Sequence, residues 1–219
     1  MGSAVEREKK AAAEAAVLMV KDGMTVGLGT GTTVAHLLPA LARRELSIRC
    51  VATSPRTEAA ADALGIRVEP FDTIDRLDLA IDGADQVSPD GWLVKGGGAA
   101  LTREKLVAVT ADRFIIIADS TKQVDALHSP IPLELLEFGL ASTLRRLPSV
   151  AVRRVPKSPD GGVIADFEGD LGDPTLLAAF FGATPGVVEH GLFPPDLVGT
   201  VLIAHGAEVD VIAVSDPAP

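Results

Sequence analysis

Short apolar segments alternate with helix-like segments from residue 6 to residue 118, and each apolar segment runs into a turn or a charged loop. The residues predict strands at 24–28, 48–52, 66–71, 77–81 and 114–118, and helices at 6–20, 34–44, 56–64 and 101–110. In such an alternation each helix crosses back over the sheet by a right-handed connection, so that successive strands become parallel. The pattern therefore predicts the α/β class, with a doubly wound, mostly parallel sheet.

The pattern changes after residue 124, where prolines become frequent. We expect a hairpin with its turn at 160–162, a helix at 173–181 with Asp173 as its N-cap, and short strands at 187–188 and 192–193. These elements indicate a smaller α+β domain, while the last apolar segments, 200–204 and 209–214, return to the first sheet. We therefore predict two domains: residues 1–127 plus 203–219, and residues 128–202.

The formal net charge of −10 disfavours nucleic-acid binding, and the chain has no Lys- or Arg-rich run. The first ten residues are charged and lack the apolar core of a signal peptide. The longest span without charge, residues 23–42, is too rich in glycine and threonine for a membrane helix. Cys50 is the only cysteine, which favours a reducing compartment. We expect a soluble cytoplasmic protein with no nucleic-acid or membrane partner.

The loop at 27–33 (GLGTGTT) joins a predicted strand to a predicted helix. Its glycines allow a ligand to approach the backbone, and the helix N-terminus offers free N–H groups to an anion. Thr30, Thr32 and Thr33 add hydroxyl groups. A dinucleotide fingerprint would need a third glycine at position 32 and an acidic residue about 20 positions farther on, and the chain has neither. A plain tight turn is the other interpretation.

Two carboxylates follow the predicted strand at 77–81. Asp82 and Asp85 are separated by Gly83 and Ala84, whose small size lets both carboxylates enter one pocket. Repulsion between neighbouring like charges raises the pKa of one of them, which suits a group that exchanges protons near neutral pH. The alternative is a solvated turn after a strand.

An amine, a glycine loop and a third carboxylate follow within one short stretch. Lys95 precedes Gly96, Gly97 and Gly98, and its charge and their amides can stabilise a developing oxyanion. Glu104 lies just beyond this loop, and a carboxylate partly removed from water beside Lys95 is a candidate general base. On spacing alone, an exposed helix residue that pairs with a nearby Lys or Arg is the simpler interpretation of Glu104.

Two further lysines are candidate phosphate contacts. Lys122 follows the apolar segment 114–118, at the same predicted edge of the sheet. Lys9 or Lys10, in the first predicted helix, could also reach a phosphate. Plain solvation is the other interpretation of both, and we favour it for Lys10. The four histidines are scattered and form no metal-ligand pair, and no Ser-His-Asp or Cys-His arrangement stands out.

Five motifs stand in the order and spacing of the ribose-5-phosphate isomerase type A family, which the chain resembles from about residue 9 to its end. They lie at residues 27–33, 53–57 with 65–66, 82–85, 95–105 and 118–122; the segment 185–193 is also similar to the family. The resemblance implies interconversion of D-ribose 5-phosphate and D-ribulose 5-phosphate in the non-oxidative pentose phosphate pathway, through an enediolate and without metal or cofactor. It also implies a Rossmann-like catalytic domain, a smaller ferredoxin-like α+β domain, and a homodimer or larger homo-oligomer.

Carried over position by position, the resemblance makes Glu104 the general base, with Asp82, Asp85 and Lys95 as further catalytic residues. The implied substrate-binding residues are Lys9, Thr30, Gly31, Thr32, Thr33, Asp82, Gly83, Ala84, Asp85, Lys95, Gly96, Gly97, Gly98 and Lys122. Thr32 stands where the family usually has Ser, and Gln86 stands where it usually has Glu. The sequence leaves open which aspartate opens the sugar ring.

Three other functions fit the sequence less well. A glucosamine-6-phosphate deaminase of the same broad superfamily is disfavoured by the segment 95–105. A sugar-phosphate sensor would need a DNA-binding module, whereas residues 1–23 before the first predicted strand form a single helix rather than a helix-turn-helix. A nicotinamide-dependent oxidoreductase is disfavoured by the spacing of the glycine loop.

Overall fold

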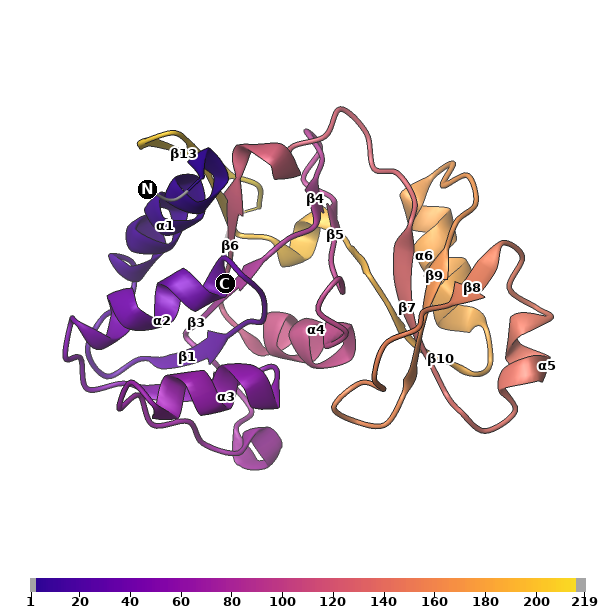
Figure 1. Ribbon diagram of the computed structural model, residues 1–219, viewed down its shortest axis with the longest axis horizontal. Coiled ribbons are helices and arrows are strands. Elements are labelled where there is room, and N and C mark those ends of the chain that lie inside the picture. The colour runs from indigo at the N-terminus through magenta and orange to yellow at the C-terminus, as the bar shows by residue number, and fades with distance from the viewer. Residues whose placement is uncertain (1–2, 216–219) are drawn as a thin grey trace.

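The structure, a computed structural model, describes residues 3–215; residues 1–2 and 216–219 of the predicted first domain lie outside this part. Figure 1 shows a larger unit at the left, built around a six-stranded sheet, and a smaller unit at the right. No helix within residues 3–215 combines the length and apolar character that crossing a membrane requires.

The sheet of the larger unit has the strand order β13-β12-β6-β3-β1-β2. Its strands are β1 (Thr25–Leu28), β2 (Arg49–Ala52), β3 (Leu79–Gly83), β6 (Phe114–Asp119), β12 (Thr200–His205) and β13 (Glu208–Ala213). Every neighbouring pair is parallel except β12 and β13. The predicted doubly wound, mostly parallel sheet is confirmed, as is the return of the last two apolar segments to it. Strand β12 begins at Thr200, slightly before the predicted boundary at residue 203.

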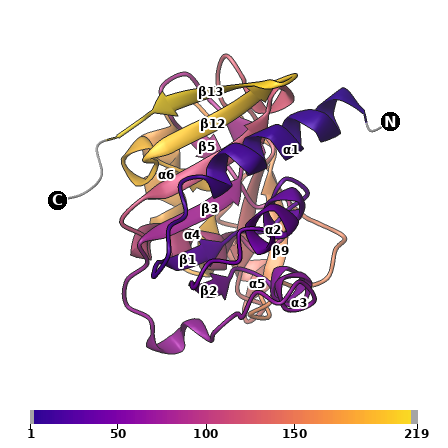
Figure 2. The same cartoon turned by 90° about the vertical axis from the view of Figure 1, so that its left-hand side faces the viewer.

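Helices cover both faces of this sheet. They are α1 (Ala4–Val17), α2 (Val34–Ala42), α3 (Pro55–Asp62) and α4 (Leu101–Thr110). Side chains alternate along a strand, so Ile115 and Ile117 of β6 pack among residues of α1 and α2, which Figure 2 shows on one side of the sheet. Phe114 and Ile116 pack instead with Val107 of α4. Burial on both faces explains why β6 reads as a continuous apolar run.

The predicted third strand at 66–71 is wrong. Only an isolated bridge between Val68 and Cys50 forms there, and the chain then enters the 3₁₀ turn η1 (Phe71–Thr73). The segment lies beside β2, at the end of the sheet order. Pro70 has no N–H to continue the ladder, so the pairing ends before it becomes a strand.

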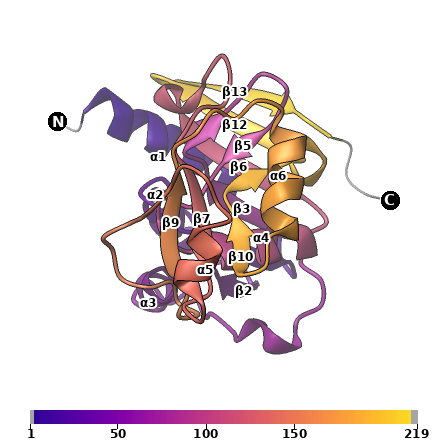
Figure 3. The ribbon, with the colours of Figure 1, turned by 90° about the vertical axis from the view of Figure 1, so that its right-hand side faces the viewer.

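The smaller unit has the element order β-α-β-β-α-β. Its elements are β7 (Ile131–Leu135), α5 (Leu140–Leu144), β8 (Val150–Val152), β9 (Val163–Phe167), α6 (Pro174–Ala183) and β10 (Val187–His190). The four strands form an antiparallel sheet in the order β10-β7-β9-β8, which is a ferredoxin-like arrangement (Figure 3). The predicted hairpin is the β8–β9 pair, and the Asp173 side chain caps α6 by accepting a hydrogen bond from Thr175 N–H.

A third, small sheet connects the two units. It has the order β11-β5-β4, with β4 (Gln86–Val87), β5 (Leu93–Val94) and β11 (Leu192–Phe193), and η3 (Pro195–Leu197) follows β11. The sequence does not predict this sheet, because its strands are two residues long and one partner comes from a distant segment.

The strand order also fixes where a ligand can bind. From β1 the chain moves to β2 on one side, and from β3 it moves to β6 on the other. The carboxyl ends of β1 and β3 therefore flank the point at which the winding reverses, and loops diverge there to leave a crevice.

Candidate active site

A cavity lies at this reversal point. The residues that line it are Thr30, Gly31, Thr32, Thr33, Gly83, Ala84, Asp85, Lys95, Gly96, Gly97, Gly98, Glu104 and Lys122. All of them belong to the site expected from the sequence, and they come from loops that are far apart in the chain. Asp82 and Lys9 belong to the expected set but are not among the lining residues.

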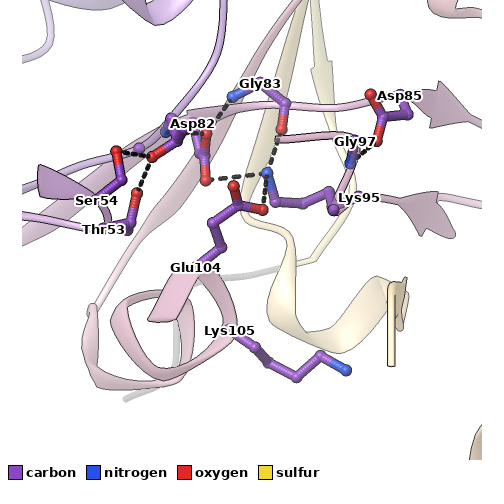
Figure 4. Close-up of polar contacts among 12 residues, drawn as sticks. Thr53, Ser54, Asp82, Gly83, Asp85, Lys95, Gly97, Glu104 and Lys105 are labelled. Carbon is purple, nitrogen blue, oxygen red and sulfur yellow. Dashed lines mark hydrogen bonds and ion pairs between the residues drawn. The ribbon is translucent and has the colours of Figure 1, made fainter. Parts of the chain in front are cut away.

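Lys95 is the centre of the cavity's polar network (Figure 4). Its Nζ lies 2.9 Å from Oδ2 of Asp82 and 3.3 Å from Oε2 of Glu104. The same ammonium group donates a hydrogen bond to the carbonyl oxygen of Gly83. The side chains of Lys95, Asp82 and Glu104 are each 3% exposed, so the three charges interact with little screening by water. Glu104 is therefore not the exposed helix residue that spacing alone favours.

Burial shifts the proton affinity of all three groups. Burial raises the pKa of Glu104 to about 8. The positive charge of Lys95 lowers this pKa, and the negative charge of Asp82 raises it, but burial is the largest effect. It also raises the pKa of Asp82, again against Lys95. Burial alone would lower the pKa of Lys95, but the two carboxylates outweigh it and raise that pKa. Two buried carboxyl groups thus share one ammonium, and the raised pKa brings the proton exchange of Glu104 close to neutral pH, the range in which an acid–base group is most effective.

Asp82 lies behind the cavity wall. Its Oδ1 accepts hydrogen bonds from Thr30 N–H at 3.0 Å and Gly83 N–H at 2.7 Å, and it is 2% exposed. A Cβ atom at Gly29 would lie 2.0 Å from this carboxylate, so the loop after β1 can close on Asp82 only as glycine. The sequence-based expectation attributes a raised aspartate pKa to repulsion between Asp82 and Asp85; the structure corrects this, because burial is the main cause.

Asp85, by contrast, is exposed in the cavity. Its Oδ2 accepts a hydrogen bond of 2.7 Å from Gly97 N–H, which joins the loop after β3 to the glycine loop after β5. A Cβ atom at Gly97 would lie 2.8 Å from Oδ1 of Asp85. Of the two aspartates, Asp85 is the one that a ligand can reach.

The hydroxyl of Thr30 points into a network of hydroxyl groups. Its Oγ1 lies 2.7 Å from Oγ1 of Thr53 and 2.8 Å from Oγ of Ser54, the N-cap of α3. Thr57 continues the network and donates to the carbonyl oxygen of Gly29 at 2.9 Å. Both the N–H and the hydroxyl of Thr30 are thus engaged within the protein. The sequence shows the segment 53–57 as a motif but not its role, since the role depends on β1 and β2 lying side by side.

The remaining expected residues have distinct positions. Lys122 lines the cavity at the end of the 3₁₀ turn η2 (Ser120–Lys122), whereas Lys9 forms an ion pair of 2.8 Å with Glu6. Gln86 is buried, and its amide both donates to and accepts from the backbone of His128, at 2.7 and 2.9 Å. A glutamate could only accept there, so Gln86 suits this backbone position.

Glu8 is a supporting residue that the sequence does not suggest. Its Oε2 accepts from Ser120 N–H at 3.1 Å and from the Ser120 hydroxyl at 2.7 Å, and its Oε1 accepts from Gly206 N–H at 2.9 Å. One carboxylate of α1 thereby anchors the turn that carries Lys122. Within residues 3–215, no three His, Cys, Asp or Glu side chains gather as metal ligands.

Comparison with known proteins identifies relatives along nearly the whole chain. Residues 49–208 match the sequence profile of the family described as ribose 5-phosphate isomerase A (phosphoriboisomerase A). The ribose-5-phosphate isomerase A of Rhodopseudomonas palustris (strain HaA2) is 44% identical over 216 residues, which cover 90% of this chain and 93% of the relative.

Solved structures agree with this match. Ribose 5-phosphate isomerase A from Neisseria gonorrhoeae superposes with a TM-score of 0.91 at 29% identity, covering 96% of this chain and 98% of the other. A D-ribose-5-phosphate isomerase in complex with phospho-erythronic acid superposes with a TM-score of 0.90 at 32% identity, covering 97% and 100% of the two chains.

Proposed function

Because the chain belongs to the ribose 5-phosphate isomerase A family, which interconverts an aldose and a ketose phosphate, we propose that Glu104 is the base that moves the proton in this reaction. The substrate pair is D-ribose 5-phosphate and D-ribulose 5-phosphate, as in the non-oxidative pentose phosphate pathway. The observation that carries the proposal is the position of Glu104: it lines the cavity, is buried, and lies 3.3 Å from Lys95.

The phosphate of the substrate binds at the loop after β1 and at Lys122. Gly31, Thr32 and Thr33 precede the N-terminus of α2, where free N–H groups and the helix dipole attract an anion. Lys122 adds a positive charge from another loop. Thr30 is a support for this loop rather than a ligand, because its own polar groups are already engaged.

Asp85 handles the hydroxyl proton when the furanose ring opens. It is exposed in the cavity, while both carboxylate oxygens of Asp82 are held by Thr30, Gly83 and Lys95. Asp82 acts instead as the counter-ion that keeps Lys95 in place. This division of roles follows from accessibility.

Glu104 then removes the proton from C2 of the open aldehyde, and the C2–H electron pair forms the C1–C2 double bond of an enediolate. The negative charge moves to the O1 oxygen, where the ammonium group of Lys95 stabilises it. The proton of the O2 hydroxyl then moves to O1, which leaves the negative charge on O2. Glu104 returns its proton to C1 as the electron pair of the C1–C2 double bond forms the new C1–H bond, and the electron pair on O2 forms the ketone at C2. Such a base contributes roughly 10²–10⁴-fold to the rate. A relative that binds phospho-erythronic acid supports this scheme, because the carboxylate of that acid resembles the planar, charged end of an enediolate.

The direct test is ketose formation from D-ribose 5-phosphate by the purified protein. We expect turnover by the wild-type protein and its loss in E104Q, with D-ribose 5-phosphate still bound. Binding without turnover by the wild-type protein would instead identify a sugar-phosphate sensor. Turnover by E104Q at the wild-type rate would show that Glu104 is not the base.

We also propose a homo-oligomeric state and a cytoplasmic location, both from the family relationship. Cys50 supports a reducing compartment, because it is the only cysteine of the chain and so no intrachain disulfide can form. Light scattering coupled to gel filtration tests the oligomeric state, and a mass of about 23 kDa, that of one chain of 22.7 kDa, would contradict it.

A further inference from the structure

Arg153 reaches from the smaller unit to the glycine loop of the cavity. It follows β8, and its Nη1 donates hydrogen bonds to the carbonyl oxygens of Gly96 at 3.2 Å and Gly97 at 3.4 Å. Its Nε donates to Oδ2 of Asp166 on β9 at 2.8 Å, and its Nη2 donates to Oδ1 of the same carboxylate. The planar guanidinium is thus fixed on one edge by Asp166 and presents the other edge to the loop.

The bond to Gly96 has a consequence for Asp85. The carbonyl of Gly96 and the N–H of Gly97 belong to one planar peptide unit and point in opposite directions. Arg153 holds the oxygen side of that plane, and Asp85 accepts from the N–H side at 2.7 Å. Gly96 has a φ of +106°, a conformation that favours glycine. Within the loop its carbonyl accepts a hydrogen bond from Ala99 N–H at 3.1 Å, and Arg153 adds a second bond to the same oxygen from outside the loop.

The contacts of Arg153 exclude a role as a phosphate ligand. Asp166 neutralises its charge, and both edges of the guanidinium are engaged within the protein, so it is not a phosphate ligand. It does not line the cavity. The pKa of Arg153 is raised, first through its hydrogen bond to Asp166, and Asp85 contributes to the rise, so the charges of Arg153 and Asp85 are within electrostatic reach.

We propose that Arg153 is a positioning residue of the isomerase: it holds the Gly96–Gly97 peptide plane so that Asp85 and the glycine loop meet the sugar end of the substrate. The inference rests on the proposed isomerase function. It also gives the smaller unit a part in the reaction, because that unit supplies the side chain that sets one wall of the cavity.

The test compares R153K with R154K. Lysine keeps the charge at position 153 but has no planar fork, so it cannot bind Asp166 and the loop carbonyls together. Arg154 is the exposed neighbour and serves as the matched control. We expect kcat to fall about 10- to 100-fold in R153K, the cost of a displaced reacting group, while R154K keeps wild-type turnover.

Two inhibitors separate positioning from structural damage. In the proposed binding mode the sugar-like end of phospho-erythronic acid meets the glycine loop, whereas inorganic phosphate occupies only the loop after β1 and Lys122. In R153K the inhibition constant of phospho-erythronic acid rises about tenfold or more and that of phosphate does not change. Partial unfolding would leave both constants unchanged, and general damage to the cavity would raise both; either result overturns the proposal, as would wild-type turnover in R153K.

If R153K does not fold, D166N replaces it, because it loosens the same guanidinium without removing it. The same split between the two inhibitors supports the proposal, and its absence overturns it. Hydrogen exchange at the Gly97 amide needs no substrate: it accelerates in R153K if Arg153 holds the peptide plane and is unchanged if it does not. Absence of isomerase activity in the wild-type protein would refute the proposed function alone, and the exchange result would still decide the role of Arg153.

Discussion

The ammonium nitrogen of Lys95 lies 3.3 Å from the carboxylate of Glu104, and both side chains are 3% exposed. A buried ion pair of this kind adds little net stability, but removing one partner leaves an uncompensated charge in the interior. The pair therefore links the chemistry of the cavity to the stability of the fold.

Lys95→Met tests this link. The substitution leaves Asp82 and Glu104 buried without a counter-ion, so we expect a loss of about 3–5 kcal/mol in the free energy of unfolding at pH 8 and loss of turnover. Lys10→Met is the control, because Lys10 is 61% exposed and lies 3.8 Å from Glu14, and an exposed pair contributes about 0–1 kcal/mol. Urea denaturation measures the free energy of unfolding of both variants. Equal losses in the two variants would contradict the role of Lys95 as the counter-ion of the buried carboxylates.

The pH dependence of activity follows from the raised pKa of Glu104. Only the ionised form is a base, and kcat/KM reports groups of the free enzyme. With the pKa at about 8 we expect kcat/KM to fall as pH decreases below that value. A profile that stays flat down to the ordinary glutamate value of 4.5 would contradict this prediction.

The same shift predicts how stability depends on pH. Between 4.5 and about 8 the folded protein binds the Glu104 proton more tightly than the unfolded chain does, so stability falls as pH rises through this range. E104Q lacks this contribution. The Tm of E104Q minus that of the wild type should therefore increase with pH, as thermal unfolding at pH 5 and pH 8 would show. A difference that is constant or decreases would be evidence against the raised pKa.

Two threonines of one loop should respond differently to the same substitution. Thr30→Val removes the hydroxyl that contacts Thr53 and Ser54, and we expect a loss of about 1–3 kcal/mol in stability from the groups left unpaired. Thr32 is exposed and lines the cavity, so Thr32→Val should leave stability unchanged and raise KM. Thermal unfolding and steady-state kinetics on both variants check this contrast. A Thr30→Val variant with wild-type stability and a raised KM would contradict the supporting role given to Thr30.

Gly29 should not tolerate a side chain. The Cβ atom of Gly29→Ala would lie 2.0 Å from the Asp82 carboxylate, so we expect the loop to be displaced and turnover to be lost. Gly182 in α6 has no atom within 4 Å of the corresponding position, and Gly182→Ala should stabilise the helix by about 1 kcal/mol. Tm and turnover of the two variants test the difference; normal turnover in Gly29→Ala would show that Asp82 need not stay where it is.

Much of this site is predictable from the sequence, because motifs that follow parallel strands converge at one edge of the sheet. The loop at 27–33, Asp85 and Lys122 all follow this rule. The burial of Glu104 does not follow from this rule. In the sequence Glu104 is an ordinary helix position, and only the β11–β5–β4 sheet places Lys95 beside it. Pro70 ends a segment that otherwise has the alternation of a strand. Arg153 carries no signal in the sequence at all, because its contact with Gly96 depends on how the two units pack.

The most direct test of the account follows the C2 proton itself, with D-ribose 5-phosphate that carries deuterium at C2. The wild-type protein should remove the deuteron from C2 as the ketose forms, and E104Q should remove it roughly 10²–10⁴-fold more slowly while still binding phospho-erythronic acid. Removal of the deuteron by E104Q at the wild-type rate would show that another group is the base.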